Sequence, residues 1–167
     1  AFSGAGGKTT AMFTLARELK PPLLVTATTH LHLDQLRLAD THHIAAKPED
    51  LKEMEGSLHG LTLVTGPFEG ERTRGVISDV FLRLYEISQN HALPLLVEAD
   101  GSRQHPLKAP APHEPVIPPQ AGTVGVVSGL SGLGRPLGED WVHRPQVFGE
   151  MAGLGQGEIV TAQALGR

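Results

Sequence analysis

The sequence contains no cysteine among its 167 residues. This absence excludes disulfide bonds, cysteine-ligated metals and thiol nucleophiles. The chain also has no uninterrupted apolar stretch near the ~18 residues that a membrane-spanning helix needs, and it does not start with a secretory signal pattern. We therefore expect a cytoplasmic protein without a membrane partner.

Basic runs are missing as well, and the net charge is −4. A protein that binds a duplex through its phosphates needs a concentrated basic surface, so we expect no nucleic-acid partner. The length fits one domain over residues 1–167, long enough to bury a core. Because the sequence stops where residues 161–165 begin a capped helical pattern, we expect this domain to lack its C-terminal part.

The most informative feature that is present is a glycine-rich segment followed by a helical pattern. Glycines let the backbone turn several N–H groups toward one point, where a following helix adds the positive end of its dipole. Lys8 is predicted to reach the β- and γ-phosphates of a nucleotide, and the Thr9 hydroxyl to bind Mg²⁺. The residues of this segment predicted to bind ATP or GTP are Gly4, Ala5, Gly6, Gly7, Lys8, Thr9 and Thr10.

The loop departs from the full G-x-x-x-x-G-K-T pattern, because Phe2 stands where the first glycine should be. It is the shorter Gly-x-x-Gly-Lys-Thr variant, which is similar to that of Mur ligases. Phosphate binding tolerates this change, but the loop does not identify the class of NTPase. The alternative interpretation is a glycine-rich turn before an ordinary helix.

Apolar periodicity predicts alternating helices and strands along the rest of the chain. Helices are predicted over 8–19 and 76–89, with weaker helical patterns at 31–39 and from 48. Strands are predicted over 23–26, 43–45, 61–65, 93–97 and 124–127. This alternation predicts an α/β fold, a mainly parallel sheet with helices on both faces, arranged as a P-loop NTPase-like three-layer sandwich.

Two carboxylates, Glu98 and Asp100, follow the predicted strand over 93–97. Residues two apart on a strand point to the same side, so both are predicted to face the nucleotide. Asp100 is the predicted Mg²⁺ ligand, and Glu98 is assigned a supporting or water-orienting role. With Lys8 they form the candidate catalytic set. Acidic residues also end strands without any function, which is the alternative here.

A hydroxyl-rich turn, Thr26–His30, ends the strand over 23–26. Ligands of parallel sheets bind outside the carboxyl ends of the strands, so Thr28 and Thr29 are predicted to face the same crevice. The alternative is that these β-branched residues only complete the strand.

Nine histidines suggest a metal site, and His30, His32, His42 and His43 cluster in the sequence. Without a cysteine or carboxylate at ligand spacing, polar surface is the preferred interpretation. Cationic side chains in loops are further candidates for contacts with phosphate or an anionic substrate, namely Arg72, Arg74, Arg103, Lys108, Arg135 and Arg144.

Six of the 13 prolines lie between Pro106 and Pro119. Such a density excludes regular helix and central strand. Because proline is already restricted in the unfolded chain, ordering the segment costs little further entropy. We predict that it packs over the crevice and brings Lys108 or His113 within reach of the γ-phosphate or a substrate; the alternative is a mobile linker.

With these motifs in view, the chain resembles the YqeC family, described as selenium-dependent hydroxylase accessory proteins. The matching segments are residues 4–10, 26–30, 98–102, 107–111, 113–118 and 142–145. The Lys-Ala-Pro and His-Glu-Pro motifs in 108–115 are the specific part of the match.

The resemblance implies a P-loop NTPase-like protein that serves the maturation of selenium-dependent molybdenum hydroxylases, with such an enzyme or its maturation proteins as partner. It leaves ATP and GTP open. The residues alone support three functions: a Mg²⁺-dependent NTPase, a non-hydrolysing nucleotide-gated binding module, or a Mur-ligase-like or kinase-like transferase acting on a small anionic substrate. The absence of an Asp-x-x-Gly switch, with Arg103 at the glycine position, favours the binding module over the NTPase.

Overall fold

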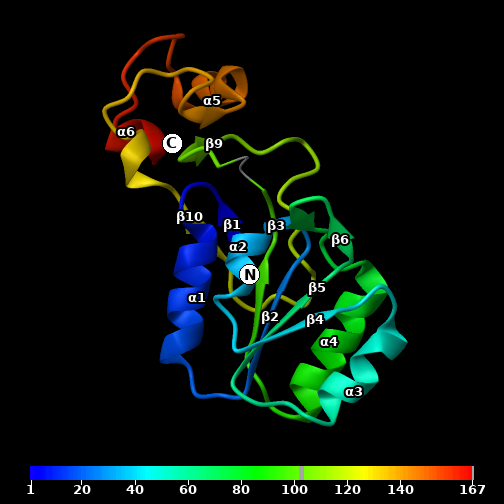
Figure 1. Ribbon diagram of the computed structural model, residues 1–167. Coiled ribbons are helices and arrows are strands. Elements are labelled where there is room, and N and C mark those ends of the chain that lie inside the picture. The colour runs from blue at the N-terminus through cyan, green and yellow to red at the C-terminus, as the bar shows by residue number, and fades with distance from the viewer. Residues whose placement is uncertain (102–103, 167) are drawn as a thin grey trace.

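A six-stranded parallel sheet forms the middle layer of the molecule (Figure 1). The structure is a computed structural model that describes residues 1–101 and 104–166. The strands stand in the order β10-β1-β8-β2-β5-β4. Their bounds are β1 (Phe2–Gly4), β2 (Leu23–Ala27), β4 (Thr41–Ile44), β5 (Leu61–Thr65), β8 (Leu95–Glu98) and β10 (Gly125–Val127). Every residue of β2 and β5 is buried, as a parallel sheet covered on both faces requires.

Helices cover both faces of this sheet, α1 on one side and α3 and α4 on the other (Figure 1). The helical elements of this part are α1 (Lys8–Glu18), α2 (Leu33–Leu36), the 3₁₀ turn η1 (Pro48–Leu51), α3 (Lys52–Glu55) and α4 (Ser78–Asn90). Alternate residues of β2 serve the two layers: Leu23 and Val25 pack with α1, and Leu24 packs with α4. The predicted three-layer α/β sandwich is confirmed.

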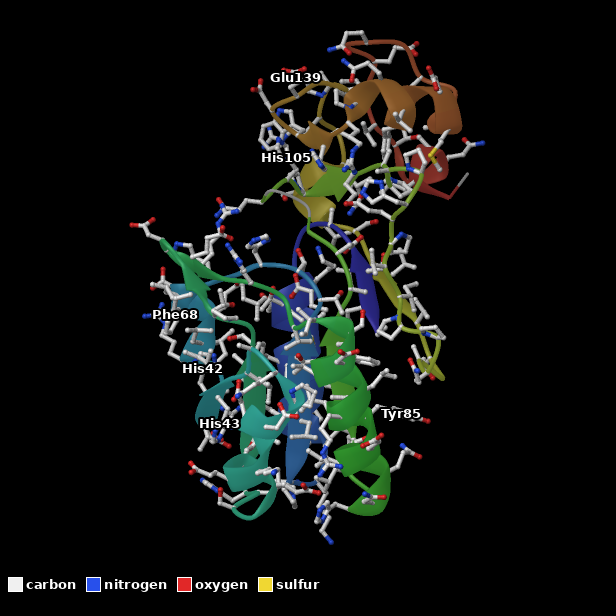
Figure 2. The ribbon with its side chains drawn as sticks, turned by 90° about the vertical axis from the view of Figure 1, so that its right-hand side faces the viewer. His42, His43, Phe68, Tyr85, His105 and Glu139 are labelled. Atoms are coloured by element: carbon white, nitrogen blue, oxygen red, sulfur yellow. The ribbon has the colours of Figure 1, made fainter. Side chains whose placement is uncertain are left out.

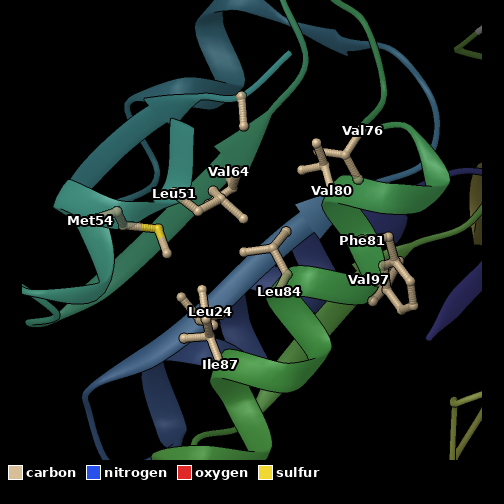
Figure 3. Packing of buried hydrophobic residues seen from close by; sticks show 11 residues of the cluster. Leu24, Leu51, Met54, Val64, Val76, Val80, Phe81, Leu84, Ile87 and Val97 are labelled. Atoms are coloured by element: carbon tan, nitrogen blue, oxygen red, sulfur yellow. The ribbon is translucent and has the colours of Figure 1, made fainter. Parts of the chain in front are cut away.

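The core under α4 is the larger apolar cluster, seen from close by in Figure 3. Val80, Leu84 and Ile87 project from one face of the helix toward Leu24 and Val64 of the sheet. This spacing of three and four residues is the pattern from which the sequence predicts the helix. Among the described residues, no helix is both long and apolar enough to cross a bilayer.

Two smaller substructures stand at the carboxyl edge of the sheet. A small antiparallel sheet has the order β3-β7-β6, formed by β3 (Leu31–His32), β6 (Phe68–Glu69) and β7 (Arg72–Thr73). A C-terminal lobe, at the top of Figure 1, contains β9 (Leu107–Lys108), β11 (Val142–His143), α5 (Pro145–Ala152) and α6 (Ala162–Leu165), preceded by the 3₁₀ turn η2 (Leu130–Gly132). It has an apolar core of its own, around Leu107 and Phe148.

The element predictions fail where long-range pairing decides the structure. The stretch 31–39 is not one amphipathic segment but β3 followed by α2, because Leu31 and His32 pair with β7. The helix predicted from 76 begins at Ser78, and the strand predicted over 93–97 is displaced to β8. The β9–β11 pair, β6, β7 and α5 have no counterpart in the sequence-based prediction. The short helix after Thr161 is confirmed, with the Thr161 hydroxyl accepting from the Ala164 N–H.

Replacing Leu84 with alanine tests the packing of α4. Leu84 is 0% exposed, so Leu84→Ala should lower the free energy of unfolding by about 2–5 kcal/mol, as expected for a large-to-small change in a packed core. The control is Leu82→Ala on the same helix, where a 44% exposed side chain should cost less than about 1 kcal/mol. Urea unfolding of the three proteins measures both; equal losses would contradict the proposed packing.

Candidate functional site

The glycine-rich loop joins β1 to α1 at the carboxyl edge of the sheet. Three of its glycines, Gly4, Gly6 and Gly7, have a positive φ and cannot be replaced without strain. A Cβ on Gly4 (φ +103°) would lie 2.2 Å from the Val127 carbonyl oxygen, and one on Gly6 (φ +49°) would lie 2.6 Å from that of Pro106. The loop therefore owes its shape to close contact with β10 and with the chain that follows β8.

The backbone N–H groups of the loop divide into two sets. The Gly4 N–H donates to Asp100, that of Ala5 to the Val127 carbonyl (2.8 Å) and that of Gly6 to the His105 carbonyl (3.1 Å). The N–H groups of the first turn of α1 have no intrahelical acceptor, and no described side chain caps them. These last groups form a natural site for an anion at the positive end of the helix.

A pocket of about 470 Å³ opens over this helix end, within the usual range for small-molecule sites. Of the residues singled out from the sequence, its wall contains Gly6, Gly7, Lys8, Thr9, Thr10, Thr29 and Glu98. Others lie behind the wall or away from it: Gly4, Ala5, Thr28, Asp100 and Lys108. Thr28 instead bonds back to the Glu98 carbonyl through its N–H at 2.9 Å.

Asp100 is buried, and its carboxylate oxygens contact both cations and hydrogen-bond donors. Its oxygens lie 2.8 Å from the Lys108 ammonium and 3.4 Å from that of Lys8. Ser3 and the Gly4 N–H donate to it at 3.1 Å. The side chain is 1% exposed, so these partners offset the cost of burying its charge.

Glu98, in contrast, faces the pocket beside the Thr9 hydroxyl. Thr9 donates to Glu98 at 2.7 Å and accepts from the Gln35 amide at 2.8 Å, whereas the Lys8 ammonium is 3.9 Å away from Glu98. Burial raises the pKa of the Glu98 carboxyl, with the charge of Asp100 acting in the same direction, while Thr9 and Lys8 lower it. Glu98 therefore has one cation, at 3.9 Å, whereas Asp100 has two cations within 3.4 Å.

Lys108 connects this centre to the C-terminal lobe. Besides Asp100, its ammonium lies 3.2 Å from Glu114, which in turn accepts from Arg144 at 2.7 Å. Burial acts to raise the pKa of Glu114, but hydrogen bonds from Arg144, the Ala111 N–H and Lys108 outweigh it and lower the pKa from 4.5 to about 2. The chain of ion pairs runs from Asp100 to Arg144 without a break.

The start of the proline-dense segment lies against the loop, since Pro106 stands beside Gly6 and its carbonyl accepts from the Gly129 N–H. Lys108 is 2% exposed and turned toward Asp100, so the structure does not bring it to the pocket wall. His113 is exposed and is not part of that wall either. The segment contributes Glu114 to the wall instead.

Two facing groups of side chains complete the pocket. The small antiparallel sheet and its approach supply His30, His32 and Arg72, and the other wall has Gln104, His105, His143 and Arg144. His105 and His143 stack with ring centres 5.9 Å apart. Gln104 (φ +65°) and Arg144 (φ +64°) adopt left-handed conformations that are uncommon outside glycine and that cluster at functional sites.

The histidines that cluster in the sequence have separate partners in the fold. His30 lies 3.1 Å from Glu69, His32 accepts from the Asp34 N–H, and His42 bonds Thr65 at 2.8 Å. Figure 2 shows His42 beside Phe68 and His43 next along β4, both far from His105. Within the described ranges, no group of three or more histidine or acidic side chains is placed to hold a metal ion.

The candidate cations also separate into two kinds. Arg72 and Arg144 line the pocket, whereas Arg74 pairs with Glu69 at 3.0 Å and Arg135 lies over the Trp141 ring at 4.3 Å. Arg103, the residue predicted to occupy the switch position, and Ser102 lie outside the described residues.

Sequence reasoning missed Gln35, His105 and His143 on the pocket wall, and the ion pair between Glu114 and Arg144. Gln35 sits in the stretch interpreted as amphipathic, and no local pattern sets it apart. Two signals pointed to this pair: Arg144 is among the candidate cations of the sequence, and the segments 113–118 and 142–145 are among the matching motifs.

Comparison with known proteins agrees with the resemblance drawn from the motifs. A family model described as "YqeC protein" matches residues 1–146. Over 158 residues the chain is 32% identical to a protein of Escherichia coli described as "Uncharacterized protein YqeC", an alignment that covers 90% of this chain and 59% of that relative. The chain thus spans less than two thirds of the relative's length. No solved structure matches.

The ion pairs of Glu114 should contribute to stability at neutral pH. Its pKa is depressed in the folded protein, so the contribution is complete above the unfolded value of 4.5 and is lost as the pH falls toward about 2. Glu114→Gln should cost about 2 kcal/mol at neutral pH and nothing at the acid end of that window. Denaturant unfolding across pH measures this, with Glu53→Gln at an exposed position as control. A loss independent of pH would contradict the assignment.

Proposed function

This chain belongs to the YqeC family, and we propose that it binds a nucleoside triphosphate with Mg²⁺ in the pocket over residues 4–10. The observation that carries this proposal is the pairing of the Thr9 hydroxyl with Glu98 at the uncapped end of α1. A hydroxyl and a carboxylate in contact beside a lysine are the parts that a P-loop protein uses for phosphate and metal.

The topology supports an orientation for the nucleotide. β8 and β2 lie on one side of β1, and β10 lies on the other. Thr9 contacts Glu98 at the end of β8, so the metal and the γ-phosphate belong on this side. The sugar and base then extend toward the loop after β10. Because neither wall of the pocket distinguishes adenine from guanine, we propose that the nucleotide is ATP or GTP.

We assign the metal-facing carboxylate to Glu98 rather than to Asp100, the ligand predicted from the sequence. The carboxylate of Asp100 already has two lysines and two further donors, whereas Glu98 lies at the pocket wall with a raised pKa. Thr9 and Glu98 offer the hard oxygen ligands that Mg²⁺ prefers, and phosphate oxygens and water complete its coordination in such sites. When bound, Mg²⁺ neutralises charge on the β- and γ-phosphates.

In this proposal, Lys8 leaves its contact with the Gly4 carbonyl (2.8 Å) to reach the phosphates, and the first-turn N–H groups of α1 hold them in place. Thr29 and Gln35 stand beside the γ-phosphate side of the pocket, where a water molecule would attack. We infer that hydrolysis is the reaction, with Glu98 orienting that water or the metal. From the family resemblance we propose that the reaction serves maturation of selenium-dependent molybdenum hydroxylases in the cytoplasm.

The nucleotide-gated binding module is a second candidate, favoured by one observation. Asp100 pairs with Lys8 of the loop and with Lys108 of the C-terminal lobe. Binding of phosphate at Lys8 would change the charge balance at Asp100. It would thereby change the strength of the ion pair between Asp100 and Lys108, which attaches the C-terminal lobe. Phosphate release by the purified protein separates the two functions: steady turnover that Glu98→Gln abolishes supports the NTPase, and nucleotide binding without turnover supports the module.

Removing the ammonium of Lys8 tests nucleotide binding itself. Lys8→Ala should weaken the binding of a Mg²⁺–ATP or Mg²⁺–GTP analogue by about a hundredfold or more, because a buried cation no longer meets the phosphates. Isothermal calorimetry measures the affinity, and thermal unfolding verifies the fold. Lys20→Ala, at an exposed position beyond the end of α1, is the control. Unchanged affinity in Lys8→Ala would refute the proposal.

The raised pKa of Glu98 predicts a stability change in the protein without nucleotide or metal. The folded protein holds this proton to higher pH than the unfolded chain, so stability falls as the pH rises from 4.5 through the folded pKa. Glu98→Gln removes that penalty and should raise the free energy of unfolding by about 0.5–2 kcal/mol at neutral pH, while removing the Mg²⁺ dependence of nucleotide binding.

Unfolding of wild type and Glu98→Gln across pH measures this difference, which should vanish below the unfolded value of 4.5. Glu86→Gln, at a 61% exposed side chain, serves as control. A less stable Glu98→Gln protein at every pH would mean that the contacts of Glu98 outweigh its burial.

A further inference from the structure

The charge on the pocket wall differs in sign from that of the whole chain. The protein carries a net charge of −4, yet its pocket has three permanent cations, Lys8, Arg72 and Arg144, against two acids, Glu98 and Glu114. Four imidazoles add further donors to the same wall. One triphosphate at the loop accounts for Lys8. Of the other two cations, Arg72 remains available for a second anion.

Among the described residues, Arg72 is the cation of the pocket wall for which no ion pair is seen. Arg144 is held by Glu114 at 2.7 Å. Arg74, which follows the end of β7, pairs with Glu69 at 3.0 Å. No carboxylate of the described residues pairs with Arg72, although it lines the pocket. Arg72 is exposed at the pocket wall, and Glu69 stands opposite it in the pairing of β7 with β6 without forming an ion pair with it. A guanidinium with five donors in such a place is suited to bind a carboxylate or phosphate in a bidentate manner.

The position of Arg72 relative to the loop is fixed by hydrogen bonds. Arg72 lies opposite His32 in the pairing of β7 with β3. The His32 N–H donates to the Gln35 amide oxygen at 2.7 Å, and the Gln35 amide nitrogen donates to the Thr9 hydroxyl at 2.8 Å. Arg72 and His32 therefore belong to the wall beside Thr9, on the side assigned to the γ-phosphate.

We propose that Arg72, with His30 and His32, binds the anionic group of a second, small substrate that carries a carboxylate or a phosphate. This substrate lies beside the γ-phosphate, so the pocket holds two reactants side by side. The inference rests on the proposed nucleotide site and extends it, since a nucleotide alone does not need this wall. His30 is braced by Glu69 at 3.1 Å, which directs the imidazole from outside the pocket.

The experiment first saturates the full chain with Mg²⁺ and a non-hydrolysable triphosphate analogue. Inorganic phosphate, malonate and succinate are then titrated in turn, and binding is followed by calorimetry. At least one of these anions should bind to the loaded wild type, and Arg72→Gln should weaken that binding by about tenfold or more. Arg74→Gln is the matched control and should leave the affinity within about twofold, because Arg74 faces Glu69.

Three results would overturn the inference. None of the anions binds, or Arg72→Gln and Arg74→Gln change anion binding alike. In the third, Arg72→Gln weakens binding of the triphosphate analogue but not binding of the corresponding nucleoside diphosphate. The last result would make Arg72 a γ-phosphate contact. Failure of the nucleotide site is recognised separately, because the analogue would then not bind or would not respond to Lys8→Ala. An anion could also bind at the empty phosphate loop, and the same titration on nucleotide-free protein tests this. Anion binding that Lys8→Ala abolishes there would place the anion at the loop and would also overturn the second site.

Discussion

The buried carboxylate of Asp100 is the interaction on which the arrangement of the site depends. It accepts from the backbone of Gly4 at the end of β1, pairs with Lys8 at the start of α1 and pairs with Lys108 in β9. A carboxylate this deeply buried is stable only with such partners. Because each partner belongs to a different element, satisfying one charge fixes the loop, the helix end and the C-terminal lobe relative to one another.

Glu98 and Asp100 are two residues apart, yet their surroundings give them different chemistry. Asp100 has four partners, two lysines and two hydrogen-bond donors, and lies behind the pocket wall. Glu98 has one hydroxyl and a lysine at 3.9 Å, and burial raises its pKa. In the proposed function Asp100 therefore organises the site, and Glu98 is the carboxylate that faces the metal.

The fold was largely predictable because it is built from local patterns. Continuous apolar runs such as 61–65 became buried parallel strands, and the spacing of Val80, Leu84 and Ile87 predicted the helix over them. The glycine-rich loop was recognisable since its residue types are required by the backbone geometry that the structure has. These parts need no knowledge of distant residues.

The rest of the site depends on contacts between residues far apart in the sequence. Lys108 was expected at the nucleotide, but pairing of β9 with β11 and the buried charge of Asp100 turn it inward. The pocket wall at Gln35 exists because β3 pairs with β7, which joins residues forty positions apart and splits a stretch that reads as one helix. Composition and periodicity contain no information on such pairs.

The same geometry couples the loop to the C-terminal lobe. In this structure Lys8 divides its ammonium between the Gly4 carbonyl and the carboxylate of Asp100. A phosphate that draws Lys8 away leaves Lys108 as the principal cation of Asp100. The carboxylate is then neutralised by the lysine of β9 alone. Lys108 also holds Glu114, and Glu114 holds Arg144 at the opposite wall of the pocket. In the proposed nucleotide-gated function, occupancy of the loop and the placement of that wall would be linked through Asp100, Lys108 and Glu114, and the C-terminal lobe would be the part that responds to the ligand.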